Sequence, residues 1–181
     1  CSKNNSGSLA PLDRLETAPV SAPAPASGWT FPRTLGHYSA GLPGPTLIVV
    51  GGTHGNEPAG VEAALRVLDA LKADTPQISG EFLAFTGNVK ALERGVRYLE
   101  RDLNRSWDDD RVEQLRDSDP QLDGPEDAEV RELLGLIEVA LERATGPVVL
   151  IDLHTTSGDG PPFTVMSDTL RNRPIAFAMP V

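Results

Sequence analysis

The chain has 181 residues, enough for one domain of ordinary size with a buried core. It carries 26 acidic against 16 basic side chains, and the net charge of −10 argues against nucleic acid or an anionic membrane surface as its main partner, because both require basic patches. The single cysteine, Cys1, excludes a disulfide framework and a cysteine zinc cluster. Since no apolar stretch has the length of a membrane span, we expect no membrane-spanning segment and a cytoplasmic location, with a lipid anchor at Cys1 as the alternative.

The N-terminal part of the chain differs in composition from the rest. Residues 1–28 are rich in Ser, Ala, Pro and Gly, which cannot bury enough apolar area to offset their chain entropy, so they are predicted to form a disordered linker or tail. From Trp29 the pattern changes, and residues 29–181 are expected to fold. Residues 29–38 are predicted as an extended edge strand, and the Gly-Leu-Pro-Gly-Pro stretch at 41–45 as a turn.

A strand and a helix are predicted next. The continuous apolar run at 46–50 indicates a central strand buried on both faces. After a glycine-rich turn, Asn56 suits a helix N-cap and Pro58 a first helical turn. A helix is therefore predicted over 59–71. The apolar residues at helical spacing are Val61, Leu65, Leu68 and Leu71.

The second half of the chain continues this alternation. Strands are predicted at 81–86, 148–153 and 162–166, of which 148–153 is expected to be buried, and the charged stretch 94–107 is predicted to be irregular. Residues 125–143 indicate an amphipathic helix. Its predicted apolar face consists of Val130, Leu133, Leu134, Ile137 and Leu141. Strands that alternate with helices predict an α/β fold with a largely parallel mixed sheet flanked by helices.

Two motifs that follow predicted strands carry side chains typical of metal ligands. Gly-Gly-Thr-His-Gly-Asn-Glu-Pro at 51–58 contains His54 and Glu57, and Asp-Leu-His-Thr-Thr at 152–156 contains His154. Ligands bind beyond the carboxyl ends of parallel strands, so these three side chains are expected to meet. Two histidines and one carboxylate leave the fourth position of a tetrahedral zinc open for water, the pattern of a catalytic site. A histidine tucked into a tight turn is the alternative for His54 alone, but it leaves the second histidine unexplained.

Asp152 precedes His154 by two residues, and two interpretations remain open. Strand alternation places both side chains on the same side, so Asp152 is able to orient a ligand imidazole. It is equally able to accept hydrogen bonds from backbone or Ser/Thr groups at the end of the strand.

The segment at 97–105, Arg-Tyr-Leu-Glu-Arg-Asp-Leu-Asn-Arg, is the third informative piece. Arginine binds carboxylates through two parallel hydrogen bonds, so Arg97, Asn104 and Arg105 beside a zinc would suit a substrate that carries a carboxylate. Local composition alone favours the alternative, a surface loop held by salt bridges.

The three motifs together resemble the succinylglutamate desuccinylase and aspartoacylase family, zinc amidohydrolases related to the zinc carboxypeptidases. The motifs occur in the family's order, and the resemblance extends over about residues 33–181. It implies a zinc-carboxypeptidase-like fold in which residues 29–181 form the N-terminal part of a catalytic domain. It also implies one Zn²⁺ per chain and a substrate of the N-acyl amino acid class, whose amide bond is cleaved with a zinc-bound water as nucleophile.

Carried over by position, the resemblance implies a role for each candidate. His54, Glu57 and His154 would bind zinc, Asn104 and Arg105 would hold a substrate carboxylate, and Arg97 would polarise the scissile carbonyl and stabilise the oxyanion. Chemistry of this kind also needs a carboxylate general base. In the family that base is a glutamate well beyond the third ligand, where this chain offers only Asp159 and Asp168 before it ends. The sequence is therefore interpreted as a C-terminally truncated piece that binds zinc and hydrolyses little.

Two other functions compete with this one. A carboxypeptidase-type zinc peptidase shares the His-x-x-Glu pair and the distant histidine, and differs in acting on peptides with free C-termini. A non-catalytic module that binds a metal or a carboxylate is the alternative outside the enzymes.

Overall fold

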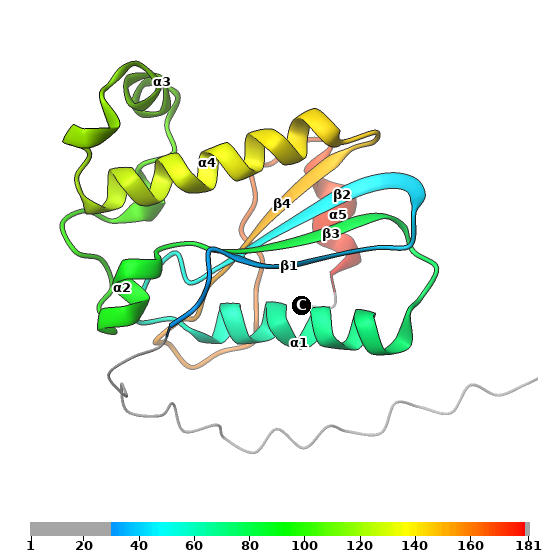
Figure 1. The fold of residues 1–181 in the computed structure, drawn as a ribbon. Helices are drawn as coiled ribbons and strands as arrows, with labels where there is room; N and C mark the ends of the chain where they lie inside the picture. Colours follow the sequence, from blue (N-terminus) through cyan, green and yellow to red (C-terminus); the bar gives the residue numbers. More distant parts are fainter. Residues whose placement is uncertain (1–29, 180–181) are drawn as a thin grey trace, which may run out of the picture.

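The computed structural model describes residues 30–179, in which a four-stranded sheet lies between helices (Figure 1). The tail predicted at 1–28 lies outside the described residues. In chain order the elements are β1 (Thr34–Ser39), β2 (Leu42–Gly51), α1 (Ala59–Asp74), β3 (Ser79–Thr86), α2 (Val89–Arg94), the 3-10 turn η1 (Leu103–Arg105), α3 (Asp109–Asp117), the 3-10 turn η2 (Pro120–Leu122), α4 (Pro125–Arg143), β4 (Val148–Leu153) and α5 (Asn172–Ala178).

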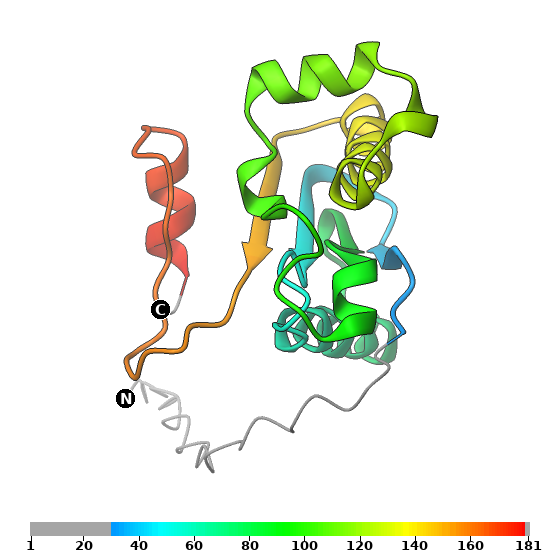
Figure 2. The same ribbon diagram turned by 90° about the vertical axis from the view of Figure 1, so that its left-hand side faces the viewer.

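The sheet has the order β1-β3-β2-β4. β2 pairs in parallel with both β3 and β4, whereas β1 is antiparallel to β3 at one edge. The predicted α/β class with a largely parallel mixed sheet is therefore confirmed. Because β2, β3 and β4 run in the same direction, their carboxyl ends share one end of the sheet, where α2 also lies; Figure 2 looks onto this end.

The central strand β2 is buried on both faces, as the run at 46–50 predicts. Ile48 and Val50 belong to one buried cluster with Leu133 of α4, and Val49 belongs to another with Leu68 of α1. Successive side chains of a strand point to opposite faces, so an unbroken apolar run supplies both cores. The result is a layered arrangement of α4, sheet and α1, which Figure 1 shows edge-on.

Helix α4 has the predicted bounds, but its buried stripe differs at the C-terminal end. Val130, Leu133 and Ala140 are buried, whereas Leu141 is 51% exposed, so its assignment to the apolar face is wrong. The stripe passes through Ala140 in the last turn and leaves Leu141 on the flank of the helix. Two acidic residues near the start of the helix, Glu126 and Glu129, are buried instead.

Strand β4 also has the predicted bounds, but it is not a buried strand. Its residues are only partly buried, and Leu150 is 50% exposed. The reason is that β4 is an edge strand of the described sheet, with β2 as its neighbour on one side. An apolar run alone does not distinguish an edge from a centre.

Three further local predictions are wrong. Residues 42–45 belong to the start of β2 rather than to a turn, and the pairing with β3 shifts register between Leu42 and Thr46. Pro58, not Asn56, occupies the N-cap position of α1, which has no side-chain cap. Residues 162–166 form no strand. In addition, α2, α3 and α5 are short helices that the apolar pattern does not predict.

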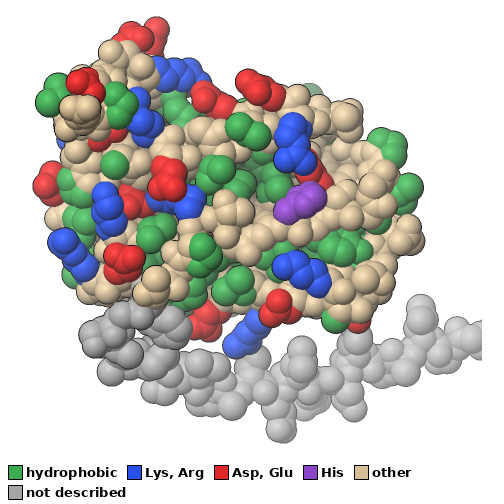
Figure 3. Space-filling view, in the orientation of Figure 1, with side chains coloured by type: hydrophobic (Ala, Val, Ile, Leu, Met, Phe, Trp, Pro, Cys, Tyr) green, Lys and Arg blue, Asp and Glu red, His purple; other side chains and the backbone are tan. Residues whose placement is uncertain are grey.

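Helix α5 and the segment before it lie on the β4 side of the sheet, apart from the layered body (Figure 2). Phe163, Val165, Leu170 and Phe177 of this region are all exposed. On the face drawn in Figure 3, acidic and basic side chains are intermixed with apolar ones. Among the residues described, none of the helices is both long enough and apolar enough to span a membrane.

Candidate metal centre

The turn after β2 has a backbone that glycine alone provides easily. Gly52 has a φ of +72°, in the left-handed region that other residues rarely adopt. At Gly55, a Cβ atom would lie 2.1 Å from the carbonyl carbon of Ala91, so only glycine allows the turn to contact α2 this closely. The turn therefore directs the side chain of His54, between these glycines, toward Glu57 at the approach to α1.

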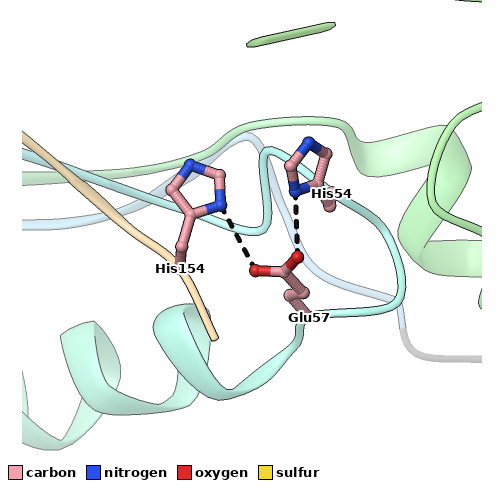
Figure 4. A group of neighbouring side chains, drawn as sticks. All are labelled: His54, Glu57 and His154. Carbon is pink, nitrogen blue, oxygen red and sulfur yellow. Dashed lines mark hydrogen bonds and ion pairs between the residues drawn. The ribbon is translucent and has the colours of Figure 1, made fainter. Parts of the chain in front are cut away.

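His54, Glu57 and His154 converge at the carboxyl ends of β2 and β4 (Figure 4). The His54 Nδ1 atom is 2.9 Å from Glu57 Oε1, and His154 Nδ1 is 3.2 Å from Glu57 Oε2. The two rings lie 4.9 Å apart between centroids. His54 and Glu57 are buried, whereas His154 lies at the surface. The three predicted metal ligands are thus brought together although 97 residues separate Glu57 from His154.

The geometry of this group fits a metal ion. One potential ligand atom from each residue lies within 4.8 Å of the others. Ligand atoms of a tetrahedral zinc, each about 2.1 Å from the metal, are separated by about 3.4 Å, close to the spacings between Glu57 and the two imidazoles. The Nδ1 atoms of the two histidines face the two oxygens of the same carboxylate, so potential ligand atoms of all three residues lie in one small region.

A carboxylate contacts the far nitrogen of each imidazole. His54 Nε2 is 3.0 Å from Asp102 Oδ1, and His154 Nε2 is 2.7 Å from Asp152 Oδ2. A carboxylate on one ring nitrogen fixes the tautomer in which the other nitrogen has a free lone pair. With a metal bound, this arrangement would leave Nδ1 of each histidine as the ligand atom.

Asp152 satisfies both interpretations that the sequence leaves open. Its Oδ2 atom contacts His154, and its Oδ1 atom accepts a 2.8 Å hydrogen bond from the hydroxyl of Thr53. The same carboxylate thus connects the ends of β2 and β4 and orients the imidazole of the third candidate ligand.

The surroundings of the group keep its carboxylates ionised. Burial alone would raise the pKa of Glu57, but the Thr155 amide, 2.7 Å away, and the two imidazoles outweigh burial and hold that pKa below its ordinary 4.5. Burial likewise would raise the pKa of Asp102, and the hydrogen bond with His54, the Asn104 amide and Arg97 lower it. Anionic Glu57 is the form that binds a cation.

Arg97 lies beside this group. Its guanidinium is 3.8 Å from Glu57 Oε1 and 3.3 Å from Asp102 Oδ2, and half of the side chain is exposed. The Arg97 carbonyl oxygen accepts a 3.1 Å hydrogen bond from the Gly55 amide, which ties the backbone of the arginine to the turn that carries His54. The structure therefore places a solvent-accessible positive charge next to the candidate ligands.

A family model described as the succinylglutamate desuccinylase/aspartoacylase catalytic domain matches residues 43–160. This range contains all three motifs and most of the described fold. The chain belongs to this family. The resemblance on which the sequence prediction rests is thereby confirmed.

Curated members of the succinylglutamate desuccinylase/aspartoacylase family match the same region. A probable aspartoacylase of Nostoc is 34% identical over 113 residues, which are 62% of this chain and 36% of the relative. An N-acyl-aromatic-L-amino acid amidohydrolase of Xenopus tropicalis is 34% identical, over 62% of this chain and 34% of the relative. The matched part of the chain thus spans about a third of the length of these relatives.

A solved structure from the family shares the fold. The succinylglutamate desuccinylase of Chromobacterium violaceum superposes with a TM-score of 0.50 at 27% identity, over 63% of this chain and 33% of that protein. This likeness agrees with the α/β sheet and the flanking helices described above.

The two other predicted site residues of this family member face different surroundings. Asn104 lines a hollow of about 290 Å³ together with Thr53 and Asp152, next to the candidate ligands. Arg105 lines a separate hollow of about 450 Å³ with Arg101 of the same loop and with polar residues of α3. Its guanidinium makes no ion pair or hydrogen bond within residues 30–179. The structure therefore groups Asn104 with the candidate ligands and leaves Arg105 on the neighbouring surface.

Sequence reasoning missed Asp102. This residue lies in the motif at 97–105, but only its neighbours in that motif were assigned roles. Its contact with His54 joins residues 48 apart in the chain through an irregular loop, which no periodic pattern predicts. The usable signal is chemical: a ligand histidine normally has a partner on its second nitrogen, so an unassigned aspartate in a family motif is a candidate.

Proposed function

We propose that this chain provides the metal centre and the substrate-binding segment of a zinc-dependent hydrolase that cleaves the amide bond of an N-acyl amino acid. The observation that carries the proposal is the convergence of His54, Glu57 and His154, with both Nδ1 atoms facing one carboxylate and both Nε2 atoms held by aspartates. Family membership supports the deacylase class, and the donor set supports zinc.

Three ligands from the protein leave one position of a tetrahedral site for water, which defines a catalytic zinc site. When bound, zinc supplies a Lewis acid for the carbonyl and lowers the pKa of its water. The protein's part is to hold the donors in place. Asp102 and Asp152 would hold the imidazoles in the tautomer that leaves Nδ1 to the metal, and the Thr155 amide fixes the carboxylate of Glu57.

Arg97 is proposed to stabilise the negative charge that develops on the carbonyl oxygen during the reaction. Its guanidinium is held beside Glu57 and Asp102 before any substrate arrives, and half of it remains accessible. Preorganised positive charge at the reacting oxygen is usually the largest single contribution to catalysis of acyl transfer.

Asn104 and Arg105 are proposed to bind the substrate's carboxylate. Asn104 is exposed beside the candidate ligands, and the guanidinium of Arg105, which has no partner among residues 30–179, matches the geometry of a carboxylate. The hollow at Asn104 has apolar walls formed by Val50, Trp107 and Leu133, so it offers room for part of a small acyl amino acid.

Neither Asp159 nor Asp168 is a candidate for proton transfer in this structure. Asp168 is bound by Arg173 at 2.5 and 2.8 Å, and Asp159 lies exposed and makes no hydrogen bond to the candidate ligands in the described part of the chain. The carboxylates that do contact the histidines already serve as ligand or orienting groups. Among residues 30–179, the proposed roles therefore cover metal, oxyanion and substrate binding.

The proposal is tested by calorimetric titration of the zinc-loaded chain with N-acetyl-L-glutamate, N-succinyl-L-glutamate and short peptides with a free C-terminus. The N-acyl amino acids are expected to bind. Arg105→Gln is expected to lower their affinity about 10- to 100-fold, since a hydrogen bond to a charged group contributes about 1.5–3 kcal/mol. Arg116→Gln is the control, because Arg116 pairs with Glu138 away from the site. The substrate assignment would be overturned if the chain bound the peptides more tightly than the N-acyl amino acids. It would also be overturned if Arg105→Gln and Arg116→Gln bound the N-acyl amino acids with equal affinity.

A further inference from the structure

Glu126 is a buried carboxylate that the proposed chemistry does not use. It is the second residue of α4 and only 2% exposed. Its Oε1 atom accepts hydrogen bonds from the Leu99 amide at 2.6 Å and from Asn88 Nδ2 at 3.3 Å. Its Oε2 atom accepts from the amides of Glu100 and Arg101 at 3.1 and 3.2 Å. Both oxygens are thus fully engaged.

These hydrogen bonds account for the burial of the charge. Burial alone would raise the pKa of Glu126, but the three backbone amides and the Asn88 side chain outweigh it and hold that pKa below its ordinary 4.5. A location in the first turn of α4 adds the favourable field of the helix N-terminus. Glu126 is therefore an anion in the folded chain.

The amides that Glu126 accepts from belong to the loop between Arg97 and Asp102. This loop has no helix or strand hydrogen bonds of its own at 98–101. Its first end is tied to the turn of His54 through the Arg97 carbonyl and the Gly55 amide, and its last end through Asp102 and the imidazole of His54. Glu126 holds the part between these two ties.

We propose that Glu126 is a positioning residue that sets the places of Arg97 and Asp102 relative to the metal centre. The inference rests on the proposed function, since it assigns Glu126 a role in the same site. Glu126 touches neither ligands nor substrate; it acts through three consecutive amides. The hydrogen bonds from these amides to Glu126 hold the middle of the loop. They thereby fix Arg97 at one end of the loop and Asp102 at the other.

Glu129 provides a matched control one helical turn further along α4. It is 3% exposed and, like Glu126, accepts from backbone amides, those of Val89 and Lys90 at 3.0 and 3.4 Å. It also pairs with Arg33. Its partners lie at the start of α2 and before β1, so Glu129→Gln removes an equally buried charge without touching the loop at 97–102.

The first experiment measures zinc affinity by competition with a chromophoric chelator. Glu126→Gln keeps the size of the side chain but replaces one acceptor oxygen with a donor that cannot bind the amides. It is expected to weaken zinc binding roughly 2- to 30-fold, the range for residues that act through a network. In an Asp102→Asn background the same substitution should change affinity less than about twofold, because the route through His54 is already interrupted.

The inference would be overturned if Glu126→Gln lowered zinc affinity by the same factor in the wild-type and Asp102→Asn backgrounds, or if Glu129→Gln lowered zinc affinity equally. Either result would mean that Glu126 acts only on general stability. The fold is checked by circular dichroism. If Glu126→Gln does not fold, Glu126→Asp takes its place: it retains the charge and should show a smaller change in the same direction.

A second readout separates this inference from the proposed function. Amide hydrogen exchange at Leu99, Glu100 and Arg101 should accelerate at least about tenfold in Glu126→Gln and remain unchanged in Glu129→Gln. If the wild-type chain binds no zinc, the proposed function fails, and exchange still decides whether Glu126 holds the loop. Unchanged exchange at all three amides would overturn the positioning role even in a chain that binds zinc and substrate.

Discussion

Asp152→Asn is expected to weaken zinc binding without unfolding the chain. The carboxylate has two partners, His154 Nε2 at 2.7 Å and the Thr53 hydroxyl at 2.8 Å. Asparagine has nearly the same shape and can still accept from one of them, but it lacks the negative charge that stabilises an imidazole giving its other lone pair to a cation. The substitution thus removes electrostatic support for the ligand while leaving its packing in place.

The magnitude follows from the position of Asp152. Replacing a carboxylate behind a metal-bound histidine typically lowers metal affinity 10- to 100-fold, which corresponds to about 1.4–2.7 kcal/mol. The upper part of this range would suit a buried pair. Because the Asp152 side chain is 27% exposed and that of His154 31%, water screens the pair, and we expect about tenfold.

The assay is competition between the protein and a zinc chelator, read in the same buffer for all variants. Thr53→Val is the first control, since it removes the other partner of Asp152 and should change zinc affinity less than about threefold. Asp168→Asn is the second, because Asp168, in the segment before α5, pairs with Arg173 of that helix. If Asp152→Asn binds zinc within twofold of wild type, the assignment of His154 as an oriented ligand is refuted.

Three further outcomes are expected. Leu133→Ala should lower the free energy of unfolding by about 2–5 kcal/mol in urea titrations, because Leu133 is 1% exposed, whereas Leu141→Ala at the exposed flank should cost under about 1 kcal/mol. The pKa of Glu126 lies below its ordinary 4.5, so the stability it contributes is present above that value and is lost as pH falls through the folded pKa; the urea midpoint should fall on acidification, and less steeply in Glu126→Gln. Arg97→Ala should reduce the low turnover of the zinc-loaded chain about 100-fold or more while leaving zinc content unchanged; lost metal would instead indicate a structural role.

The fold class and the three candidate ligands were predictable for the same physical reason. Apolar runs of strand length that alternate with amphipathic helices specify a parallel sheet, and the ends of its strands bring distant motifs together. His54 and His154 each follow such a run, so their meeting required no knowledge of the loops. Their chemistry, two imidazoles and a carboxylate, then limited the function.

Contacts made by irregular backbone were not predictable in this way. Asp102 reaches His54 only because the loop at 97–102 folds back over the turn after β2, and Glu126 at the start of α4 reads in sequence as an ordinary acidic residue of a first helical turn. Its burial depends on the loop that it holds. The exposure of Leu150 was missed because a strand's neighbours, not its own residues, decide whether it is an edge.

The zinc content of the purified chain and of two histidine variants tests the central claim most directly. We predict about one zinc per chain for the wild type after loading and dialysis, and none retained by His54→Ala. His37→Ala should keep the metal, because His37 lies on β1 and contacts Glu81 away from the centre. A His54→Ala variant that retains as much zinc as the wild type would contradict the metal centre described here.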